Sequence, residues 1–522
     1  MKRKIISYFA AVLLMLVIFS PGCTEDFEEI NSNPNSPAIS QAAPDMLLTN
    51  AIESMTDRVH EIFFGHEMGS CWVQHMAKVQ YPDEDKYVPR MSVINNTWNS
   101  FFSVSGYDVQ VVYNIGVAKN NDSYKAVALI LKSYIVSVLT DEFGDIPYSE
   151  AFRGADATPI LSPVFDTQES IYAALLANLE EANTLLKEDG PEIGGDILFG
   201  NDLMKWKKFA NSLRLRLLLR QSDRIDPTTA MKTIVNDPDT YPIFESIDDN
   251  AALVYLGSAP NNNPINENRK TRDDHRVSKT LVDYMYTNAV IDYDYRIFVY
   301  AEPAEGPNDF VGLPNGMNAA AAAAYNGNGI SNTSKIGRYF SAAEAPGMLM
   351  SYPELQFILA EAAARGFLTG SPDLTAAESY YNEGVTSSTM TYATEIGAAI
   401  GRFYGAAADK YVPGSGGAND PLLWFLEGDG VFDPANALKQ IATQKWVAMF
   451  DQGIQAEFEW KRTGYPILTP AIAGQNGGKI PVRAYYPSDE AGRNPTNYAA
   501  AVARQGADDL NTRVWWDTKD NF

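Results

Sequence analysis

The segment DSYKAVALILKSYIVSVLTDEFGD, residues 122–145, decides the fold class of this chain of 522 residues. Its apolar residues recur three and four positions apart, which places one face of an α-helix in the core: Val127, Ile130, Leu131, Tyr134, Ile135 and Val138. Gly144 and Pro147 end the pattern, and we expect Gly144 to adopt a backbone conformation that a β-carbon would strain. The segment therefore predicts a long helix packed against other helices.

The same periodicity recurs downstream and predicts a mostly α-helical protein. Further helices are expected within residues 165–191, 201–223, 351–367, 373–385 and 432–464. Asp166 is the expected N-cap of the first of these. The last is expected to be one continuous helix that Asp433 caps, Pro434 begins and Gly464 ends. The basic residues of the second are expected to form a solvated helix face: Lys205, Lys207, Lys208, Arg214, Arg216 and Arg220.

Long irregular stretches separate these helices, at residues 255–275, 301–347 and 464–510. Loops of this length in a compact protein are usually functional or disordered, and their Asn, Gly, Pro and Tyr content favours ordered loops. No Pro/Ser-rich linker divides two cores, so residues 41–522 are interpreted as one domain. No exact repeat is visible, but helix–turn–helix pairs of weak similarity are compatible with a solenoid-like scaffold.

The N-terminal residues have the layout of an export signal. Lys2, Arg3 and Lys4 precede an apolar run at 5–19, which is shorter than the roughly 20 residues that span a bilayer. A small residue directly before Cys23 resembles the lipobox of bacterial lipoproteins. Residues 1–22 are therefore predicted to be a signal peptide and Cys23 the lipidated N-terminus. The alternative is an ordinary signal peptide with an incidental cysteine.

Residues 23–40 are predicted to be a flexible tether between a lipid anchor and the folded domain. Its acidic residues resemble the surface-export tag of Bacteroidetes lipoproteins: Glu25, Asp26, Glu28 and Glu29. The alternative is a solvated acidic linker. The expected location is the outer membrane, on the extracellular side.

Charge and motif content restrict the possible functions. A net charge of −24 repels phosphate backbones, so nucleic acid is not an expected partner. The spacing of His60, His66 and His75 does not match a zinc-binding helix, and neither a G-x-S-x-G motif nor a P-loop occurs. We expect neither a metal, nor a cofactor, nor catalysis. The 65 Asp and Glu residues leave a glycosidase pair open as an alternative.

Several segments together resemble the SusD/RagB family of nutrient-binding outer-membrane lipoproteins, in its SusD-like starch-binding associating branch. They are CTEDFEEINSNPNSP (23–37), LTDEFGDIPYSEAF (139–152), RDDHRVSKTLVDYM (272–285), LMSYPELQFILAEAAARG (349–366), QKWVAMFDQGIQAEFEWKRTGYPIL (444–468) and VWWD (514–517). They run in family order across nearly the whole mature chain. The segment DYDYRIFVYAEP departs from the commoner Asp-Pro-Arg version of the family.

The resemblance implies a scaffold of tetratricopeptide-like helix pairs whose long loops form the ligand face. It also implies a partner, a SusC-type TonB-dependent transporter on which the protein acts as a lid. The ligand would be an oligosaccharide or, as an alternative, a peptide in the manner of RagB. A lipid-anchored glycoside hydrolase and a purely structural scaffold protein remain as alternatives.

The ligand site is expected in the early loops, which contribute to the ligand face in this family. The stretch 71–102 supplies five candidates: Trp72, Gln74, Tyr81, Tyr87 and Trp98. Tyr81 and Tyr87 are expected to be exposed because prolines follow them closely, whereas Trp72 and Trp98 are open to a core role. Asp273 and Asp274 could bind hydroxyls, although Asp273 could instead be a helix N-cap. Tyr325 in the loop 301–347 is the remaining candidate.

Overall fold

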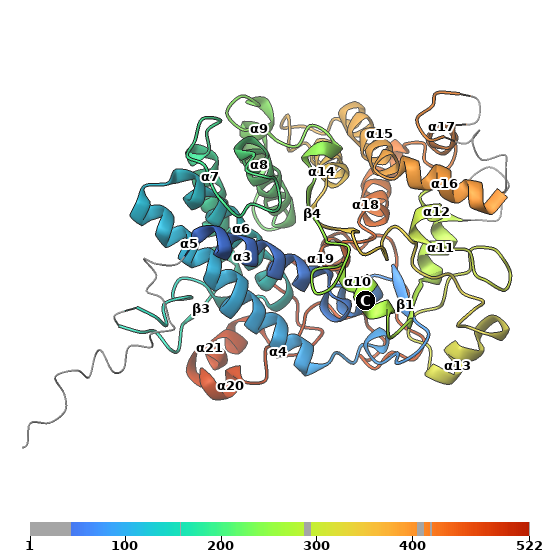
Figure 1. Ribbon diagram of the computed structural model, residues 1–522, viewed down its shortest axis with the longest axis horizontal. Helices are drawn as coiled ribbons and strands as arrows, with labels where there is room; N and C mark the ends of the chain where they lie inside the picture. Colours follow the sequence, from blue (N-terminus) through green and yellow to red (C-terminus); the bar gives the residue numbers. More distant parts are fainter. Residues whose placement is uncertain (1–42, 157, 287–293, 405–411, 418–419, 521–522) are drawn as a thin grey trace, which may run out of the picture. The chain divides into compact units, whose positions relative to one another are not determined.

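The computed structural model describes residues 43–156, 158–286, 294–404, 412–417 and 420–520 (Figure 1). The predicted signal peptide, Cys23 and the tether lie outside these residues. Pro44–Phe522 forms one compact unit.

Helices dominate this unit, which confirms the predicted fold class. The α-helices are α3 (Pro44–His60), α4 (Met91–Asn99), α5 (Gly106–Lys119), α6 (Asp122–Phe143), α7 (Gln168–Leu185), α8 (Leu203–Arg220), α9 (Thr228–Asn236), α10 (Pro264–Arg269), α11 (Lys279–Met285), α12 (Ile297–Tyr300), α13 (Ala319–Ala324), α14 (Tyr352–Ala364), α15 (Leu374–Met390), α16 (Ala393–Tyr404), α17 (Pro421–Glu427), α18 (Ala437–Ala448), α19 (Gly453–Thr463), α20 (Glu490–Arg493) and α21 (Pro495–Gln505). Among the described residues there are also two π-helical segments, η2 (Ile62–Ser70) and η4 (Ser100–Ser105), and the 3₁₀ turns η3 (Glu84–Lys86), η5 (Ile247–Asp249), η6 (Tyr325–Gly327) and η8 (Pro434–Asn436).

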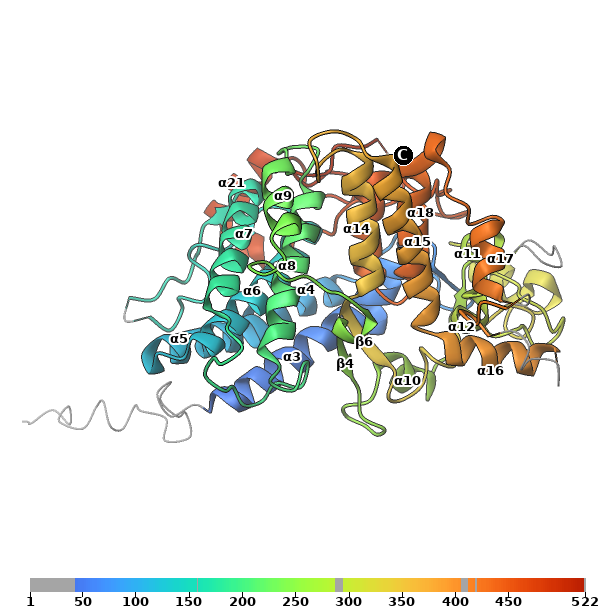
Figure 2. The ribbon, with the colours of Figure 1, turned by 90° about the horizontal axis from the view of Figure 1, so that it is seen from above.

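The longer helices pack against their neighbours in the chain. Helix α6 lies between α5 and α7, α7 packs on α8, and α14 packs on both α15 and α18. Figure 2 shows α7, α8 and α9 beside one another and α14, α15 and α18 beside one another. Helix pairs of this kind form the scaffold that the sequence predicts.

Three short antiparallel ladders connect distant loops. Strand β1 (Met76–Lys78) pairs with β5 (His275–Val277), β2 (Ile146–Pro147) with β3 (Phe165–Asp166), and β4 (Ala251–Val254) with β6 (Pro346–Met350). The β1–β5 ladder joins two loops about 200 positions apart in the sequence.

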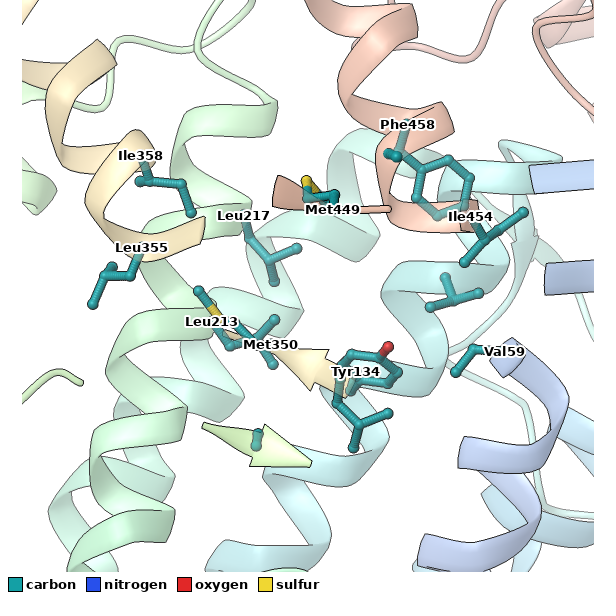
Figure 3. Packing of buried hydrophobic residues seen from close by; sticks show 14 of the residues in the cluster. Val59, Tyr134, Leu213, Leu217, Met350, Leu355, Ile358, Met449, Ile454 and Phe458 are labelled. Atoms are coloured by element: carbon teal, nitrogen blue, oxygen red, sulfur yellow. The ribbon is translucent and has the colours of Figure 1, made fainter. Parts of the chain in front are cut away.

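One continuous hydrophobic core joins the scaffold helices (Figure 3). Side chains from α3, α6, α8, β6, α14, α19 and the turn before α19 meet in it: Val59, Tyr134, Leu213, Leu217, Met350, Leu355, Ile358, Met449, Ile454 and Phe458. The buried face of α6 contains every residue that the 122–145 periodicity assigned to it. Among the described residues, no helix combines the length and apolar character that a membrane span requires.

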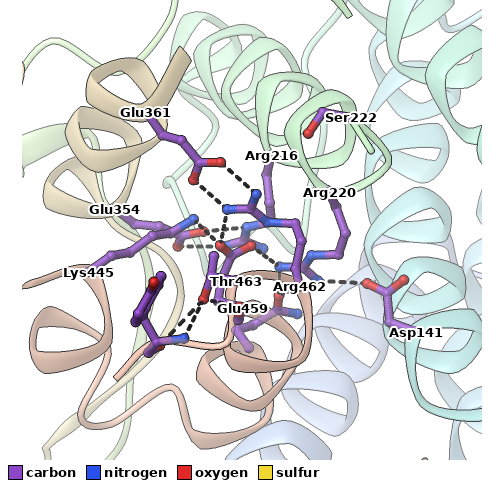
Figure 4. Close-up of polar contacts among 12 residues, drawn as sticks. Asp141, Arg216, Arg220, Ser222, Glu354, Glu361, Lys445, Glu459, Arg462 and Thr463 are labelled. Carbon is purple, nitrogen blue, oxygen red and sulfur yellow. Dashed lines mark hydrogen bonds and ion pairs between the residues drawn. The ribbon is translucent and has the colours of Figure 1, made fainter. Parts of the chain in front are cut away.

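The basic residues of α8 are not a solvated face, and this prediction was wrong for Arg216 and Arg220. Both side chains are buried and form ion pairs inside the scaffold (Figure 4). Arg216 binds Glu354 of α14 at 2.6 Å, and Arg220 binds Asp141 of α6 at 2.7 Å. Helix α8 is enclosed by other helices, so its cations find acidic partners there instead of water.

The network extends to the C-terminal helices. Glu459 of α19 accepts from Arg220 at 3.1 Å and from Arg462 at 2.9 Å, and Lys445 of α18 lies 3.0 Å from it. Burial alone would raise the pKa of Glu459, but these three cations hold it well below its usual range. Because each charge has a partner, the network avoids the large cost of an isolated buried ion.

The stretch 432–464 is two helices instead of the single helix that was predicted. Asp433 caps the turn η8 by accepting from the backbone N–H of Ala435, and Gly464 ends α19 with φ of +74°, as expected. Between α18 and α19 the chain turns, and Gly453 then approaches η2 closely. A β-carbon on Gly453 would lie 2.2 Å from Oγ of Ser70. The break therefore lets α19 pack directly against η2.

The predicted N-cap of α7 is also corrected. Thr167 caps the helix by accepting from the backbone N–H of Ser170 at 3.3 Å. The carboxylate of Asp166 instead accepts from the backbone N–H groups of Tyr148 and Ser149, at 3.0 and 2.8 Å. Asp166 therefore binds the backbone that follows β2 and does not cap α7.

Candidate functional site

The β1–β5 ladder brings most of the candidate ligand residues into one region. Lys78 lies opposite His275, and the backbone N–H of Val79 donates to the carbonyl oxygen of Asp274 at 2.8 Å. Tyr81 therefore follows one strand where Asp273 and Asp274 precede the other. We call the surface formed by Tyr81, Arg272, Asp273 and Tyr325 the loop face.

Tyr81 is the most exposed candidate on the loop face. Its side chain is 64% exposed, and the centre of the Arg272 guanidinium lies 4.4 Å from the ring centroid. Arg272 is in turn held by Asp274, whose carboxylate lies 2.8 Å from Nη2. The expected exposure of Tyr81 is confirmed, and the cation fixes the orientation of a ring that solvent can reach.

Tyr325 lies beside the same ladder. It packs against a small cluster formed by Ala77, Val79, Leu313 and Ala322. Its ring is half-buried, so part of it remains available at the surface. The loop 301–347 thus contributes an aromatic ring to the loop face next to β1.

Asp273 is partly exposed and ion-paired. Its carboxylate lies 3.2 Å from Nζ of Lys335 and 3.6 Å from Nε of Arg269. Partial burial would raise its pKa, but Arg276, Arg269 and Lys335 lower it, so the group is anionic at neutral pH. Asp273 is not a helix N-cap, because Ser278 caps α11.

A buried charged cluster supports the loop that carries Tyr81. Nζ of Lys78 lies 2.5 Å from Glu67 and 2.9 Å from Glu84, and Arg90 binds the same two carboxylates. Burial would raise the pKa of Glu67, yet hydrogen bonds and charges from His275 and Lys78 lower it to about 2. The cluster ties η2, β1 and the start of α4 together.

Asp85 connects the loop 81–90 with the loop 301–347. Its buried carboxylate accepts from the backbone N–H of Gly316 at 2.8 Å, from Nδ2 of Asn315 at 2.7 Å and from the backbone N–H of Lys78 at 3.1 Å. Burial raises its pKa to about 6, in spite of these hydrogen bonds. Sequence reasoning missed Asp85, because its partners are distant in the chain.

The expected exposure of Tyr87 was wrong. Its side chain is only 3% exposed, and its hydroxyl oxygen accepts from the backbone N–H of Ala471 at 2.8 Å. The nearby proline indicated a loop, but the loop folds inward at this residue. Tyr87 fastens the segment after α19 beneath the loop face.

Trp72 and Gln74 are buried supports of the same region. The indole N–H of Trp72 donates to the carbonyl oxygen of Glu84 at 3.3 Å. Gln74 donates to the carbonyl oxygen of Thr469 and accepts from the hydroxyl of Thr280. Both residues connect separate loops below the surface.

Three of the candidate residues have strained backbone conformations. Gln74, Tyr81 and Tyr87 have φ values of 60°, 48° and 67°, a region that residues with a β-carbon seldom adopt. Such conformations cost about 1–3 kcal/mol each and cluster at binding sites. No sequence pattern signals them, because none of the three is glycine or asparagine.

Trp98 lies apart from the loop face. It sits near the end of α4, where its ring packs 5.2 Å from Phe143 and 6.3 Å from Tyr486 and is mostly buried. These contacts agree with the interpretation of Trp98 as a core residue.

The histidines within residues 60–75 are buried packing residues. His60, His66 and His75 are buried, and burial lowers their pKa values to about 4, 3 and 3. Within the part of the chain that the structure describes, no group of His, Cys, Asp and Glu is arranged to hold a metal ion.

Comparison with known proteins gives consistent results. Residues 34–487 match the SusD-like family model described as starch-binding and associating with the outer membrane. A solved chitin-binding protein matches with 28% identity and a TM-score of 0.75, over 91% of this chain and 100% of that one. No curated protein sequence matches the chain.

Two further solved structures have the same fold. A SusD homologue from Bacteroides fragilis is 25% identical, with a TM-score of 0.72 over 92% of this chain and 100% of that one. A chitin-binding SusD homologue from Flavobacterium johnsoniae is 22% identical, with a TM-score of 0.70 over 93% of this chain and 100% of that one.

Proposed function

Because the chain belongs to the SusD-like family of starch-binding proteins that associate with the outer membrane, we propose that it captures an oligosaccharide at the cell surface and passes it to a SusC-type TonB-dependent transporter. It acts as the lid of that transporter and is itself non-catalytic. The loop face is the surface that captures the ligand. The exposed ring of Tyr81, held by Arg272, is the observation that carries this assignment.

The chemistry of the loop face favours a carbohydrate. Sugar rings present apolar C–H faces that stack on aromatic rings, while their hydroxyls bind carboxylates, amides and guanidinium groups. Tyr81 supplies the ring, and Asp273 and Arg272 supply charged hydrogen-bonding groups beside it. The exposed amides of Asn326 and Asn328 lie on the adjacent loop.

The proposed membrane attachment uses Cys23 and the tether 23–40. A tether of this length reaches at most about 60 Å when extended, at about 3.3 Å per residue. The domain can therefore stay close to a membrane partner while it moves relative to that partner. Energy for uptake would come through the transporter, so the lid itself needs only to bind and release its ligand.

Calorimetry on the mature chain without its lipid tests the proposal. Chitin oligosaccharides are the first probe, because a matched structure is a chitin-binding protein. Maltooligosaccharides and peptides follow as alternative ligands. We expect the wild type to bind a glycan and Tyr81→Ala to bind the same glycan about tenfold more weakly, since one stacked ring contributes about 1–1.5 kcal/mol.

Tyr404→Ala, at an exposed tyrosine at the end of α16, is the matched control and should leave affinity unchanged. Binding of peptides alone would favour the RagB-like alternative. Release of shorter glycans during incubation would instead support the hydrolase. Equal affinity of wild type and Tyr81→Ala would remove the ligand site from the loop face.

A further inference from the structure

We propose that this protein has a second carbohydrate subsite, a cavity at the C-terminal end of α4 that accepts one pyranose ring. This inference rests on the proposed function and names a second point of contact for the same glycan. The cavity has a volume of about 470 Å³, which is within the range of about 300–1,000 Å³ typical of small-molecule sites. We call it the α4 cavity.

Aromatic rings from four segments line the α4 cavity. Trp98 comes from α4, Phe102 from η4, Tyr107 from α5 and Phe152 from the loop after β2. The centroids of Trp98 and Phe102 are 4.7 Å apart, and those of Phe102 and Phe152 are 5.9 Å apart. Phe102, Tyr107 and Phe152 are half-buried, so part of each ring remains accessible.

Phe152 is held in a strained conformation. Its φ is +63°, which is rare for a residue with a bulky side chain. Nζ of Lys132 lies 5.5 Å from its ring centroid and 5.3 Å from that of Tyr148. Cation–π attraction and packing on Phe102 thus hold the Phe152 ring in the wall of the cavity.

Polar groups surround the aromatic wall. Ser103, Glu490 and Arg493 also line the cavity. Burial raises the pKa of Glu490, and the nearby charge of Arg493 opposes this increase. A cavity lined by aromatic rings together with hydroxyl-binding groups suits a sugar ring, which has apolar faces and a polar edge.

Helix α4 runs from the buried charged cluster to the α4 cavity. Arg90, at its N-cap, binds Glu67 and Glu84 beneath the loop face, and Trp98 lines the α4 cavity. The eight residue steps from Arg90 to Trp98 rise about 12 Å along the helix, at about 1.5 Å per residue. In Figure 1, β1, α4 and α20 all lie in the lower half of the drawing, away from α8, α9 and α15.

A glycan long enough to reach both sites would bind more tightly than a short one. Once one end is bound, the second contact is intramolecular and benefits from a high effective concentration. A disaccharide would occupy one site at a time and gain nothing from the other. The proposal therefore predicts that affinity depends on chain length.

A variant that fills the cavity gives the sharpest test. Ser103→Trp places a large side chain in the cavity lining without removing any core atom, because Ser103 is exposed. We expect it to weaken binding of chitohexaose about tenfold and binding of chitobiose less than twofold. Val104→Trp is the matched control, because Val104 is the neighbouring residue, is 40% exposed and does not line the cavity.

A second variant, Glu490→Gln, preserves the shape of the side chain and should weaken binding of chitohexaose severalfold. Circular dichroism checks that both variants are folded. Wild-type affinity for chitohexaose in Ser103→Trp and Glu490→Gln, with Tyr81→Ala still weakened, would overturn the subsite and leave the proposed function intact. If the wild-type protein binds neither sugar nor any other glycan, the proposed function itself fails.

Discussion

The side-chain amide of Gln505 forms hydrogen bonds to the backbone on both sides of Gly144. Its amide oxygen accepts from the backbone N–H of Asp145 at 2.7 Å, and its amide nitrogen donates to the carbonyl oxygen of Phe143 at 3.0 Å. Gly144 has φ of +83°, and a β-carbon there would lie 1.8 Å from that amide oxygen. The end of α6 is thus joined to α21 by a contact that only glycine permits.

Gly144→Val should therefore destabilise the protein strongly. The strained backbone and the displaced Gln505 together should cost at least about 2 kcal/mol of unfolding free energy. Urea denaturation measures the loss, and the folded fraction should bind glycan normally. Gly397→Ala is the control, because a β-carbon there has no atom within 4 Å and alanine favours the helix. Lost binding with unchanged stability would assign Gly144 to the ligand site.

Tyr87→Phe tests whether the Tyr87 hydroxyl supports the fold or contacts the ligand. The change removes the acceptor for the backbone N–H of Ala471 and leaves that buried donor unsatisfied. We expect a loss of about 1–3 kcal/mol in unfolding free energy and less than a twofold change in glycan affinity. A tenfold loss of affinity at full stability would place the Tyr87 hydroxyl in the binding site.

Arg220→Met tests the buried ion network. The substitution leaves the carboxylates of Asp141 and Glu459 buried without this cation, which should cost about 3–5 kcal/mol. Thermal and urea unfolding both measure it. Lys270→Met removes an exposed pair with Glu267 and should change stability by less than about 1 kcal/mol. Equal effects of the two variants would contradict the burial argument.

His66 gives the protein a specific pH dependence. Burial, followed by the charges of His60 and His275, lowers the pKa of His66 from 6.5 to about 3. Between these values the unfolded chain binds a proton that the native state excludes, so stability falls as pH drops from about 6.5 towards 3. His66→Gln removes this contribution.

The stability deficit of His66→Gln at pH 7.5 should therefore shrink at pH 5. The change is at most about 1.4 kcal/mol per pH unit below 6.5. Urea unfolding of both proteins at the two pH values measures it. A deficit that stays constant, or grows in acid, would show that His66 is protonated in the native state.

Cys23→Ala tests the predicted anchor. Two or more acyl chains hold a protein stably on a membrane, whereas loss of the acylated residue removes them all. The variant should appear in the soluble fraction after cell lysis, and the wild type should remain with membranes after a high-salt wash. Retention of the variant on washed membranes would contradict lipidation at Cys23.

Local patterns predicted the long scaffold helices α6, α7, α8, α14 and α15, but no helix was expected at α3, α5, α16 or α21, and α21 lies in a stretch that was expected to be irregular. Helix α6 and its glycine terminator follow from residues 122–145 alone. The break between α18 and α19 does not, since it depends on the close approach of Gly453 to η2. The burial of Arg216 and Arg220 likewise depends on their ion pairs with Glu354 and Asp141, which are more than 70 positions away in the sequence.

The candidate site was predicted only in part, for a similar reason. Tyr81 could be placed at the surface from the proline that follows it, but the same argument failed for Tyr87. Arg272, which positions the Tyr81 ring, has no signal of its own within RDDHRV. The α4 cavity could not be predicted either, because the segments that line it extend from Trp98 to Asn494.

The C-terminal segment VWWD completes the scaffold from the far end of the chain. The indole N–H of Trp516 donates to the carboxylate of Asp141 at 2.7 Å, across 375 positions of sequence. The buried carboxylate of Asp141 therefore lacks this hydrogen bond until Trp516 has emerged. A chain threaded through a translocation pore from its N-terminus would stay loosely folded during transit and acquire its cooperative stability only on release.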